Sequence, residues 1–306
     1  MIRVSVVIPT RGRPDLIARS VRAVLANDHP DFEVVVVDQS DDDRTGEIVR
    51  ALAQSDRRLR YVHTLPPGLS RAYNVGIRLT TAPVIAFTDD DCVAARDWIS
   101  SVARAFDADP AAAMLYGTVA LPNELATRAG IVPVLPIERA ERLDQRNGFR
   151  IYGMGANYAM RRSLFERVGG FDEILGGGGP LRSSQDFDFQ FRAYRCGAVV
   201  LLRPEVTVDH YGLRTPEQWP ETQRAYCIGN AAFYVKHIRC GDGGAALRLS
   251  RSILKLIVRQ ARHLVDRSRP SQLEHLRAYL DGARESLRYP IDRNRRLYLP
   301  RRPAGA

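Results

Sequence analysis

Residues 3–10, RVSVVIPT, and residues 32–38, FEVVVVD, are two short runs rich in β-branched residues that decide the fold. Each run is typical of a buried strand, and the strands end in the polar residues Thr10 and Asp38. The apolar spacing of residues 15–26 predicts a helix between them, capped by Asp15. The chain therefore begins with a strand, helix, strand unit.

The same alternation continues along the next stretch of chain. We expect helices at 44–54 and 70–79, and strands at 61–64 and 84–90. Further elements are expected at 97–108 (helix), 113–120 (strand) and 198–208 (strand). Alternating units of this length predict an α/β fold with a mostly parallel sheet and helices on both faces.

Composition restricts the class of protein. Of the 306 residues, 45% are hydrophobic and 26% charged, which excludes a disordered or collagen-like chain. No apolar run reaches the roughly 18 residues of a membrane-spanning helix, and Pro9 interrupts the opening run too early for a signal peptide. We therefore expect a cytoplasmic protein. The four cysteines form no CxxC pair, which argues against a zinc ribbon or a disulfide framework.

The net charge of +10 is concentrated in the C-terminal part. Residues 244–306 hold 15 basic and 5 acidic residues, whereas residues 1–243 hold 30 of each. A basic appendage on a neutral body argues against nucleic acid as a partner. The stretch 248–265 is a basic amphipathic helix that either lies on an anionic membrane surface, at the inner face of the cell membrane, or packs on the catalytic domain.

Chemistry is expected beyond the carboxyl ends of the strands. There, Thr88-Asp89-Asp90-Asp91-Cys92 follows an apolar run directly. Because side chains alternate along an extended chain, Asp89 and Asp91 point the same way and are suited to share Mn²⁺ or Mg²⁺ with a diphosphate, while Asp90 points elsewhere.

The first two strand ends are suited to bind a nucleotide. The loop Pro9-Thr10-Arg11-Gly12-Arg13 offers hydroxyl, N–H and guanidinium groups to a phosphate, although it matches neither a P-loop nor GxGxxG. Asp38, at the second strand end, is placed to bind a base or ribose. We therefore expect a nucleotide or nucleotide derivative as ligand.

Several motifs in order make the chain resemble the family 2 glycosyltransferases, which have the GT-A fold. They are SVVIPTRGRPDLI (5–17), VVVVDQS (34–40), GLSRAYNVGI (68–77), FTDDDC (87–92), GANYAMRRSLFERVGGFDE (155–173) and SSQDFDFQFRAYRCG (183–197). The resemblance covers most of residues 1–240. It implies an inverting transfer of a sugar from a UDP-, dTDP- or GDP-linked donor to an acceptor hydroxyl.

The resemblance and the residue pattern together assign roles. Asp186 would be the general base. The metal ligands would be Asp89 and Asp91, and His210 is either a third ligand or a structural residue. Donor contacts are expected from Pro9, Thr10, Arg11, Arg13, Asp38, Ser70, Arg71, Asn74, Asp89 and Asp90. Acceptor contacts are expected from Gly155, Asn157, Gln185 and Trp219.

The chain departs from the family pattern at two positions. Gln185 stands where the family commonly has Glu, and Tyr73 stands where it often has Arg, so cationic help to the diphosphate would come from Arg71. Asp188 lies on a different helix face from Asp186 and is expected to be a structural hydrogen-bond partner.

We expect two regions: a GT-A domain at 1–243, with a nucleotide-sugar half at 1–120 and an acceptor half at 121–243, and a basic helical extension at 244–306. Residues 290–306 are expected to be loosely held. The acceptor is a polysaccharide, a glycolipid or a small molecule. Two alternatives remain open here: a sugar nucleotidyltransferase, and a non-catalytic relative that binds nucleotide or glycan.

Overall fold

The computed structural model describes residues 1–267 and 270–301, and their contacts divide them into two compact units. The first comprises residues 1–171 and 189–216, and the second comprises residues 172–188 and 217–301. We describe each unit by itself. This division does not follow the expected boundary at residue 243, because the long helix at 219–239 packs against the two helices that follow it in the chain.

The first unit contains these elements: β1 (Val4–Thr10), α1 (Pro14–Leu25), β2 (Phe32–Asp38), α2 (Arg44–Ser55), β3 (Leu59–His63), α3 (Leu69–Leu79), β4 (Val84–Thr88), β5 (Cys92–Ala94), α4 (Trp98–Ala108), β6 (Ala112–Ala120), β7 (Glu141–Leu143), β8 (Asn157–Arg161), α5 (Arg162–Val168) and β9 (Val199–His210). Two short 3-10 helices, η1 (Asn123–Leu125) and η2 (Gln145–Asn147), lie in the connections. The elements expected from the sequence before residue 121 are confirmed within a few residues.

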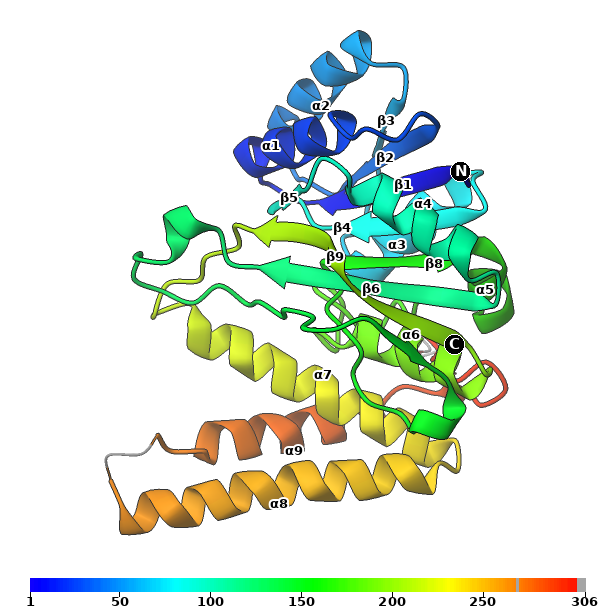
Figure 1. The fold of residues 1–306 in the computed structure, drawn as a ribbon. Coiled ribbons are helices and arrows are strands. Elements are labelled where there is room, and N and C mark those ends of the chain that lie inside the picture. Colours follow the sequence, from blue (N-terminus) through cyan, green and yellow to red (C-terminus); the bar gives the residue numbers. More distant parts are fainter. Residues whose placement is uncertain (268–269, 302–306) are drawn as a thin grey trace. The chain divides into compact units, whose positions relative to one another are not determined.

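Among the described residues, nine strands form one sheet in the order β3-β2-β1-β4-β8-β6-β9-β5, with β7 beside β9 (Figure 1). The strands β3, β2, β1 and β4 are parallel to one another, as expected. The second half differs, because β8 runs antiparallel to both β4 and β6, and β5 and β7 run antiparallel to β9. The sheet is therefore mixed.

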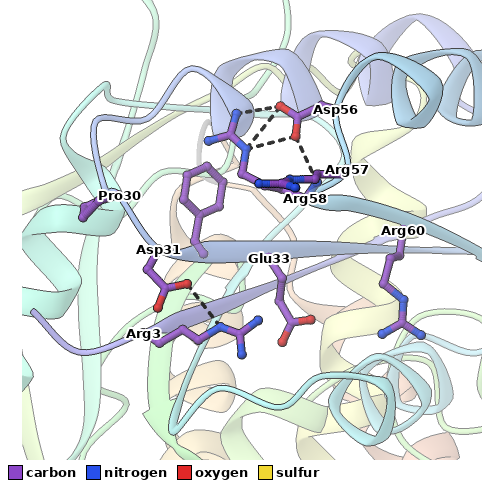
Figure 2. A pocket seen from close by; sticks show the side chains of 9 residues that line it. Arg3, Pro30, Asp31, Glu33, Asp56, Arg57, Arg58 and Arg60 are labelled. Atoms are coloured by element: carbon purple, nitrogen blue, oxygen red, sulfur yellow. Dashed lines mark hydrogen bonds and ion pairs between the residues drawn. The ribbon is translucent and has the colours of Figure 1, made fainter.

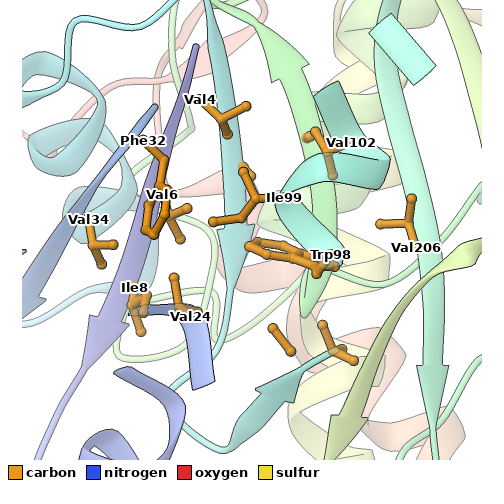
Figure 3. Packing of buried hydrophobic residues seen from close by; sticks show 14 of the residues in the cluster. Val4, Val6, Ile8, Val24, Phe32, Val34, Trp98, Ile99, Val102 and Val206 are labelled. Carbon is orange, nitrogen blue, oxygen red and sulfur yellow. The ribbon is translucent and has the colours of Figure 1, made fainter. Parts of the chain in front are cut away.

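Helices cover both faces of this sheet. The side chains of Val4, Val6 and Ile8 join a large apolar core with residues of α1, α2 and α4, including Val24 and Trp98 (Figure 3). The alternate residues of β1 face the other way. There Val7 lies so close to Gly76 of α3 that a side chain at Gly76 would overlap it. Burying both faces in this way accounts for the nearly continuous valine runs of β1 and β2.

Asp15 does not cap α1. The helix begins at Pro14, the N-cap position is Arg13, and no side-chain capping bond is present. Proline at the first helical position needs no donor partner, which explains the start one residue earlier than expected. Asp15 instead lies in the first turn, where a carboxylate is favourable.

The second unit is built from helices. α7 (Trp219–Arg239), α8 (Gly243–Val265) and α9 (Leu273–Leu287) contact one another, and a short hairpin follows, formed by β10 (Ile291–Asp292) and β11 (Leu297–Tyr298). The division between the units falls inside α6 (Gln185–Arg195), after Asp188. No helix in the described ranges is long and apolar enough to cross a membrane.

The expectation of a loosely held segment from residue 290 is wrong for 290–301. Tyr298 is buried, its hydroxyl donates to the Ala232 carbonyl at 2.7 Å, and its ring lies in an apolar cluster with Leu175 and Leu181. The many charged and proline residues of this segment hide, in the sequence, the role of Tyr298 as its anchor. The last five residues, 302–306, lie outside the described part.

Candidate functional site

The ends of three parallel strands lie at one edge of the sheet. β1 pairs with both β2 and β4, and its last residue, Thr10, is in register with Asp38 at the end of β2. The acidic run begins one residue after Thr88, where β4 ends. The edge predicted from the sequence is therefore present in the first unit.

Arg13 and Thr10 hold the acidic run from the first loop. One guanidinium nitrogen of Arg13 donates to both Asp90 and Asp91 at 2.9 Å. The Thr10 hydroxyl donates to the other oxygen of Asp90 at 2.8 Å. Asp90 thus turns toward the first loop, and Arg13 links it to Asp91.

His210 lies next to Asp91, although the two residues are far apart in the chain. β5 pairs antiparallel with β9, which places Cys92 opposite His210. The imidazole Nε2 lies 3.2 Å from a carboxylate oxygen of Asp91, and Nδ1 lies 2.7 Å from the Pro133 carbonyl oxygen. A carbonyl only accepts, so Nδ1 carries a proton and Nε2 faces the carboxylate.

The backbone of Gly212 passes very close to this pair. A β-carbon at Gly212 would lie 2.6 Å from Nε2 of His210 and 2.7 Å from the Asp91 carboxylate. The β-carbon of any other residue at position 212 would therefore crowd both Nε2 of His210 and the Asp91 carboxylate.

The charges of this cluster shift one another's pKa. Burial and the neighbouring Asp91 carboxylate raise the pKa of Asp89 to about 7. Burial also raises the pKa of Asp90. Burial works against ionisation of Asp91 as well, but the hydrogen bond and charge of His210 outweigh it and lower the Asp91 pKa. The same contact raises the pKa of His210, although burial opposes its protonation.

The donor set suits a hard divalent cation. Ligand atoms of Asp91, Cys92 and His210 lie within 4.8 Å of one another. Burial raises the pKa of the Cys92 thiol well above its usual range, so the sulfur stays protonated and is a poor ligand. Carboxylate and imidazole donors remain, and these fit Mn²⁺ or Mg²⁺.

Asp89 is held by α3. The Tyr73 hydroxyl lies 3.3 Å from an Asp89 oxygen and 3.5 Å from the Gly155 carbonyl oxygen. Tyr73 is the residue that stands where the family often has Arg. In this chain it supplies a hydroxyl, not a positive charge, beside the first aspartate.

Asp38 is fully buried and engaged. One oxygen accepts from the backbone N–H and the hydroxyl of Ser40, and the other accepts from Tyr61 at 2.9 Å. The Ser40 hydroxyl also accepts from the Gly12 N–H at 2.8 Å, which ties this strand end to the first loop. Asp38 would therefore act on a nucleotide only indirectly, by holding Ser40 and Tyr61 in place.

Two asparagines expected to touch substrate have structural roles. The Asn74 amide bonds both the N–H and the carbonyl of Phe171, at 2.9 and 3.0 Å. Asn157 has no exposed surface. Its side chain bonds the Trp98 indole and the carbonyls of Thr118 and Val206. Both amides satisfy buried backbone, which sequence spacing does not reveal, and we leave Asn157 out of the acceptor site.

The remaining expected residues are distributed as follows. In the first unit, Pro9 and Ser70 are buried, Arg71 is half-buried, and exposed Arg11 pairs with Asp41 at 3.0 Å. In the second unit, Gln185 and Asp186 form the first turn of α6. Trp219 begins α7 there and packs edge-on against Tyr226.

The sequence model described as glycosyl transferase family 2 matches residues 5–169, more than half of the chain. The chain belongs to glycosyl transferase family 2. The chain is 28% identical over 203 residues to the uncharacterized glycosyltransferase EpsJ of Bacillus subtilis, covering 63% of the chain and 56% of EpsJ. It therefore spans little more than half the length of that relative.

Two further similarities agree. The chain is 26% identical to the glucosyl-dolichyl phosphate glucuronosyltransferase of Haloferax volcanii, covering 71% of the chain and 72% of that protein. Its fold matches the mannosyltransferase PcManGT of Pyrobaculum calidifontis, solved with GDP-Man and Mn²⁺. The TM-score is 0.63 at 20% identity, with 94% and 87% of the two chains covered. The GT-A fold is thereby confirmed.

A pocket of about 540 Å³ in the first unit lies away from the acidic run (Figure 2). It is lined by residues before or at the starts of β1, β2 and β3, whereas the acidic run follows the end of β4. Its charges largely pair among themselves: Arg58 with Asp56, and Arg3 with Asp31. We assign it no role in transfer.

Sequence reasoning missed several residues of the site. Tyr61, Gly212 and Arg214 were not singled out, and Arg214 lies 3.9 Å from Asp91. Of these three residues, Gly212 was the easiest to find from the sequence. A glycine two residues after a candidate histidine ligand indicates that the backbone passes close to other groups. Tyr61 and Arg214 carry no local signal.

Proposed function

We propose that this glycosyltransferase is an inverting enzyme that moves a sugar from a nucleoside diphosphate to an acceptor hydroxyl. Asp89, Asp91 and His210 would hold a divalent cation, and Asp186 would be the general base. The observation that carries the proposal is the Asp91–His210 contact, which the backbone of Gly212 approaches closely, at the carboxyl edge of the parallel strands.

The nucleotide sugar would bind over the ends of β1, β2 and β4. Thr10, Arg11 and Arg13 offer donors to phosphate oxygens, and Arg71 offers a further cation. Arg13 contacts the carboxylates of Asp90 and Asp91, and it would turn to the diphosphate when a cation neutralises them. UDP-, dTDP- and GDP-linked donors all fit this proposal, and PcManGT, which shares the fold, was solved with GDP-Man.

Chemically, a base and a positive charge suffice. The cation would supply positive charge to the diphosphate leaving group. Asp186 would accept the proton of the acceptor hydroxyl. The hydroxyl oxygen would attack the anomeric carbon on the face opposite the leaving group, and this attack would invert the configuration at that carbon. General-base assistance of this kind typically contributes about 10²–10⁴-fold.

Acceptor recognition is assigned to residues 121–243, and donor recognition to residues 1–120. Within the acceptor part we retain Gly155, Gln185 and Trp219 as candidate contacts. Trp219 is half-buried at the start of α7, so part of its ring is available for stacking on a sugar. On this proposal the acceptor is a polysaccharide, a glycolipid or a small molecule.

α8 supports a membrane surface as an additional partner. The helix carries five Lys or Arg residues and no acidic residue. Leu249, Ile253 and Leu256 are half-buried. The exposed surface carries both apolar and basic side chains: Leu254, Ile257, Val258, Leu264, Arg251, Lys255, Arg259 and Arg262. This combination suits the anionic face of a bilayer, and a peripheral position there would bring the enzyme to lipid-linked acceptors.

The proposal is tested by thermal unfolding with UDP, GDP, dTDP and CDP, each with and without Mn²⁺. A ligand that binds only the folded state raises the melting temperature. We expect a Mn²⁺-dependent rise with one nucleotide, which Asp91→Ala abolishes. A melting temperature that no diphosphate raises would contradict the use of a nucleotide-sugar donor.

A further inference from the structure

A fully buried charge network lies in the second unit, next to the turn that carries Asp186. The Lys236 ammonium contacts Asp172 and Asp188, each at 2.6 Å, and all three side chains have no exposed surface. His237 Nε2 lies 2.9 Å from the same Asp188 oxygen and is equally buried. Asp188 was expected from the sequence to be a structural partner, and this is confirmed.

The chain on the other side of Asp186 is also attached to α7. The Ser184 hydroxyl donates to the Asn230 amide oxygen at 3.0 Å, and the Ser183 hydroxyl donates to the Ala225 carbonyl at 3.0 Å. Ser184 has φ of 68°, a left-handed conformation that a non-glycine residue adopts only when its surroundings enforce it. A side chain at Gly229 of α7 would overlap Ser183, so the two segments approach very closely.

The C-terminal hairpin completes the network. The Tyr298 N–H donates to Asp172 at 2.8 Å. Arg296 lies 3.5 Å from Nδ1 of His237 and 3.8 Å from Asp242. An arginine only donates, so Nδ1 accepts and the proton on Nε2 points to Asp188.

We propose that Lys236 and His237 are positioning residues for the Asp186 general base. They hold Asp188, two residues after the base, while Ser183 and Ser184 hold the chain two and three residues before it. This inference rests on the proposed function, in which Asp186 accepts the proton.

The physical reason is the cost of leaving buried charge unpaired. Asp172 and Asp188 are inaccessible to water, so each carboxylate depends on Lys236 and on its N–H donors. Because these partners lie on α7 and the hairpin, the first turn of α6 has one favourable placement. A base displaced by about 1 Å loses on the order of 10²-fold in rate, so this placement would control turnover.

The test compares His237→Ala with His237→Gln, because a glutamine amide can still donate to Asp188. Amide hydrogen exchange of residues 184–188 is measured first, and needs no substrate. Rates of diphosphate release from UDP-glucose, UDP-N-acetylglucosamine and GDP-mannose with Mn²⁺ are measured next. We expect faster exchange and a kcat lowered by about 10²-fold in His237→Ala, with donor KM unchanged and both properties largely restored in His237→Gln.

Ala278→Gly, on α9, is the control for loss of stability alone, because Ala278 is buried but belongs to no part of the network. It should lower the melting temperature without changing kcat or exchange at 184–188. Unchanged exchange in His237→Ala, or unchanged kcat, would overturn the inference. Full activity of Asp186→Asn would overturn the proposed base and this inference together, whereas an inactive Asp186→Asn with a fully active His237→Ala would overturn the inference only.

Discussion

Nε2 of His210 lies 3.2 Å from the Asp91 carboxylate, although the two residues are far apart in the sequence. The contact follows from the sheet, because β5 starts directly after Asp91 and runs antiparallel to the end of β9. Pro133 holds the other ring nitrogen, so the imidazole has one orientation. A carboxylate and an imidazole are thus fixed next to each other at one edge of the sheet.

Gly212→Ala should weaken Mn²⁺ binding by about 10- to 100-fold, the range seen for changes around metal ligands. Its methyl group would lie 2.6 Å from Nε2 of His210 and 2.7 Å from the Asp91 carboxylate, so both side chains would have to shift. Isothermal titration with Mn²⁺ checks the affinity. Gly177→Ala is the matched control, because nothing lies within 4 Å of its added carbon. Equal Mn²⁺ affinity in the two variants would contradict this use of Gly212.

Arg13→Met should lower the melting temperature in metal-free buffer and enlarge the rise that Mn²⁺ produces. The substitution removes the cation between Asp90 and Asp91, so the added ion relieves more repulsion. Arg11→Met serves as the control, since Arg11 pairs only with exposed Asp41 among the described contacts. If both variants gain the same from Mn²⁺ as the unaltered protein, Arg13 does not act as a substitute for the cation.

Lys236→Met should reduce the free energy of unfolding by about 3–5 kcal/mol, because it leaves two buried carboxylates without their cation. Urea unfolding measures the change. Arg277→Met removes one charge from an exposed pair with Glu274 and should cost only about 0–1 kcal/mol. A Lys236→Met protein as stable as Arg277→Met would show that the network contributes little.

Replacing Arg251, Lys255 and Arg259 with glutamine should weaken binding to phosphatidylserine vesicles by roughly 10²-fold, at about 1 kcal/mol for each basic residue near the surface. Vesicle sedimentation at low and high salt measures this, and salt should reduce binding of the unaltered protein. A second triple variant removes the same charge from α9 and its C-cap, at Arg277, Arg284 and Arg288. Equal losses in both would mean that net charge, and not the α8 surface, attracts the bilayer.

Local pattern was sufficient for the strands, the helices of the first unit and the strand-end aspartates. Val4–Thr10 and Phe32–Asp38 are valine-rich because both sheet faces are covered, and that burial is visible in the sequence itself. The ordered motifs were likewise sufficient for the family, because they require only residue type and spacing.

Only the tertiary structure decided which polar residues face the site and which satisfy the protein's own backbone. Asn74 and Asn157 belong to the sequence motifs, but their side chains bond buried groups of the protein. Gly212 and Tyr61 belong to none of these motifs, but Gly212 lies against His210 and Asp91, and Tyr61 bonds Asp38. The anchoring of Tyr298 on Asp172 was hidden for the same reason. Periodicity reports how one segment is buried, but a hydrogen bond between distant segments depends on strand pairing and helix packing, which no local pattern encodes.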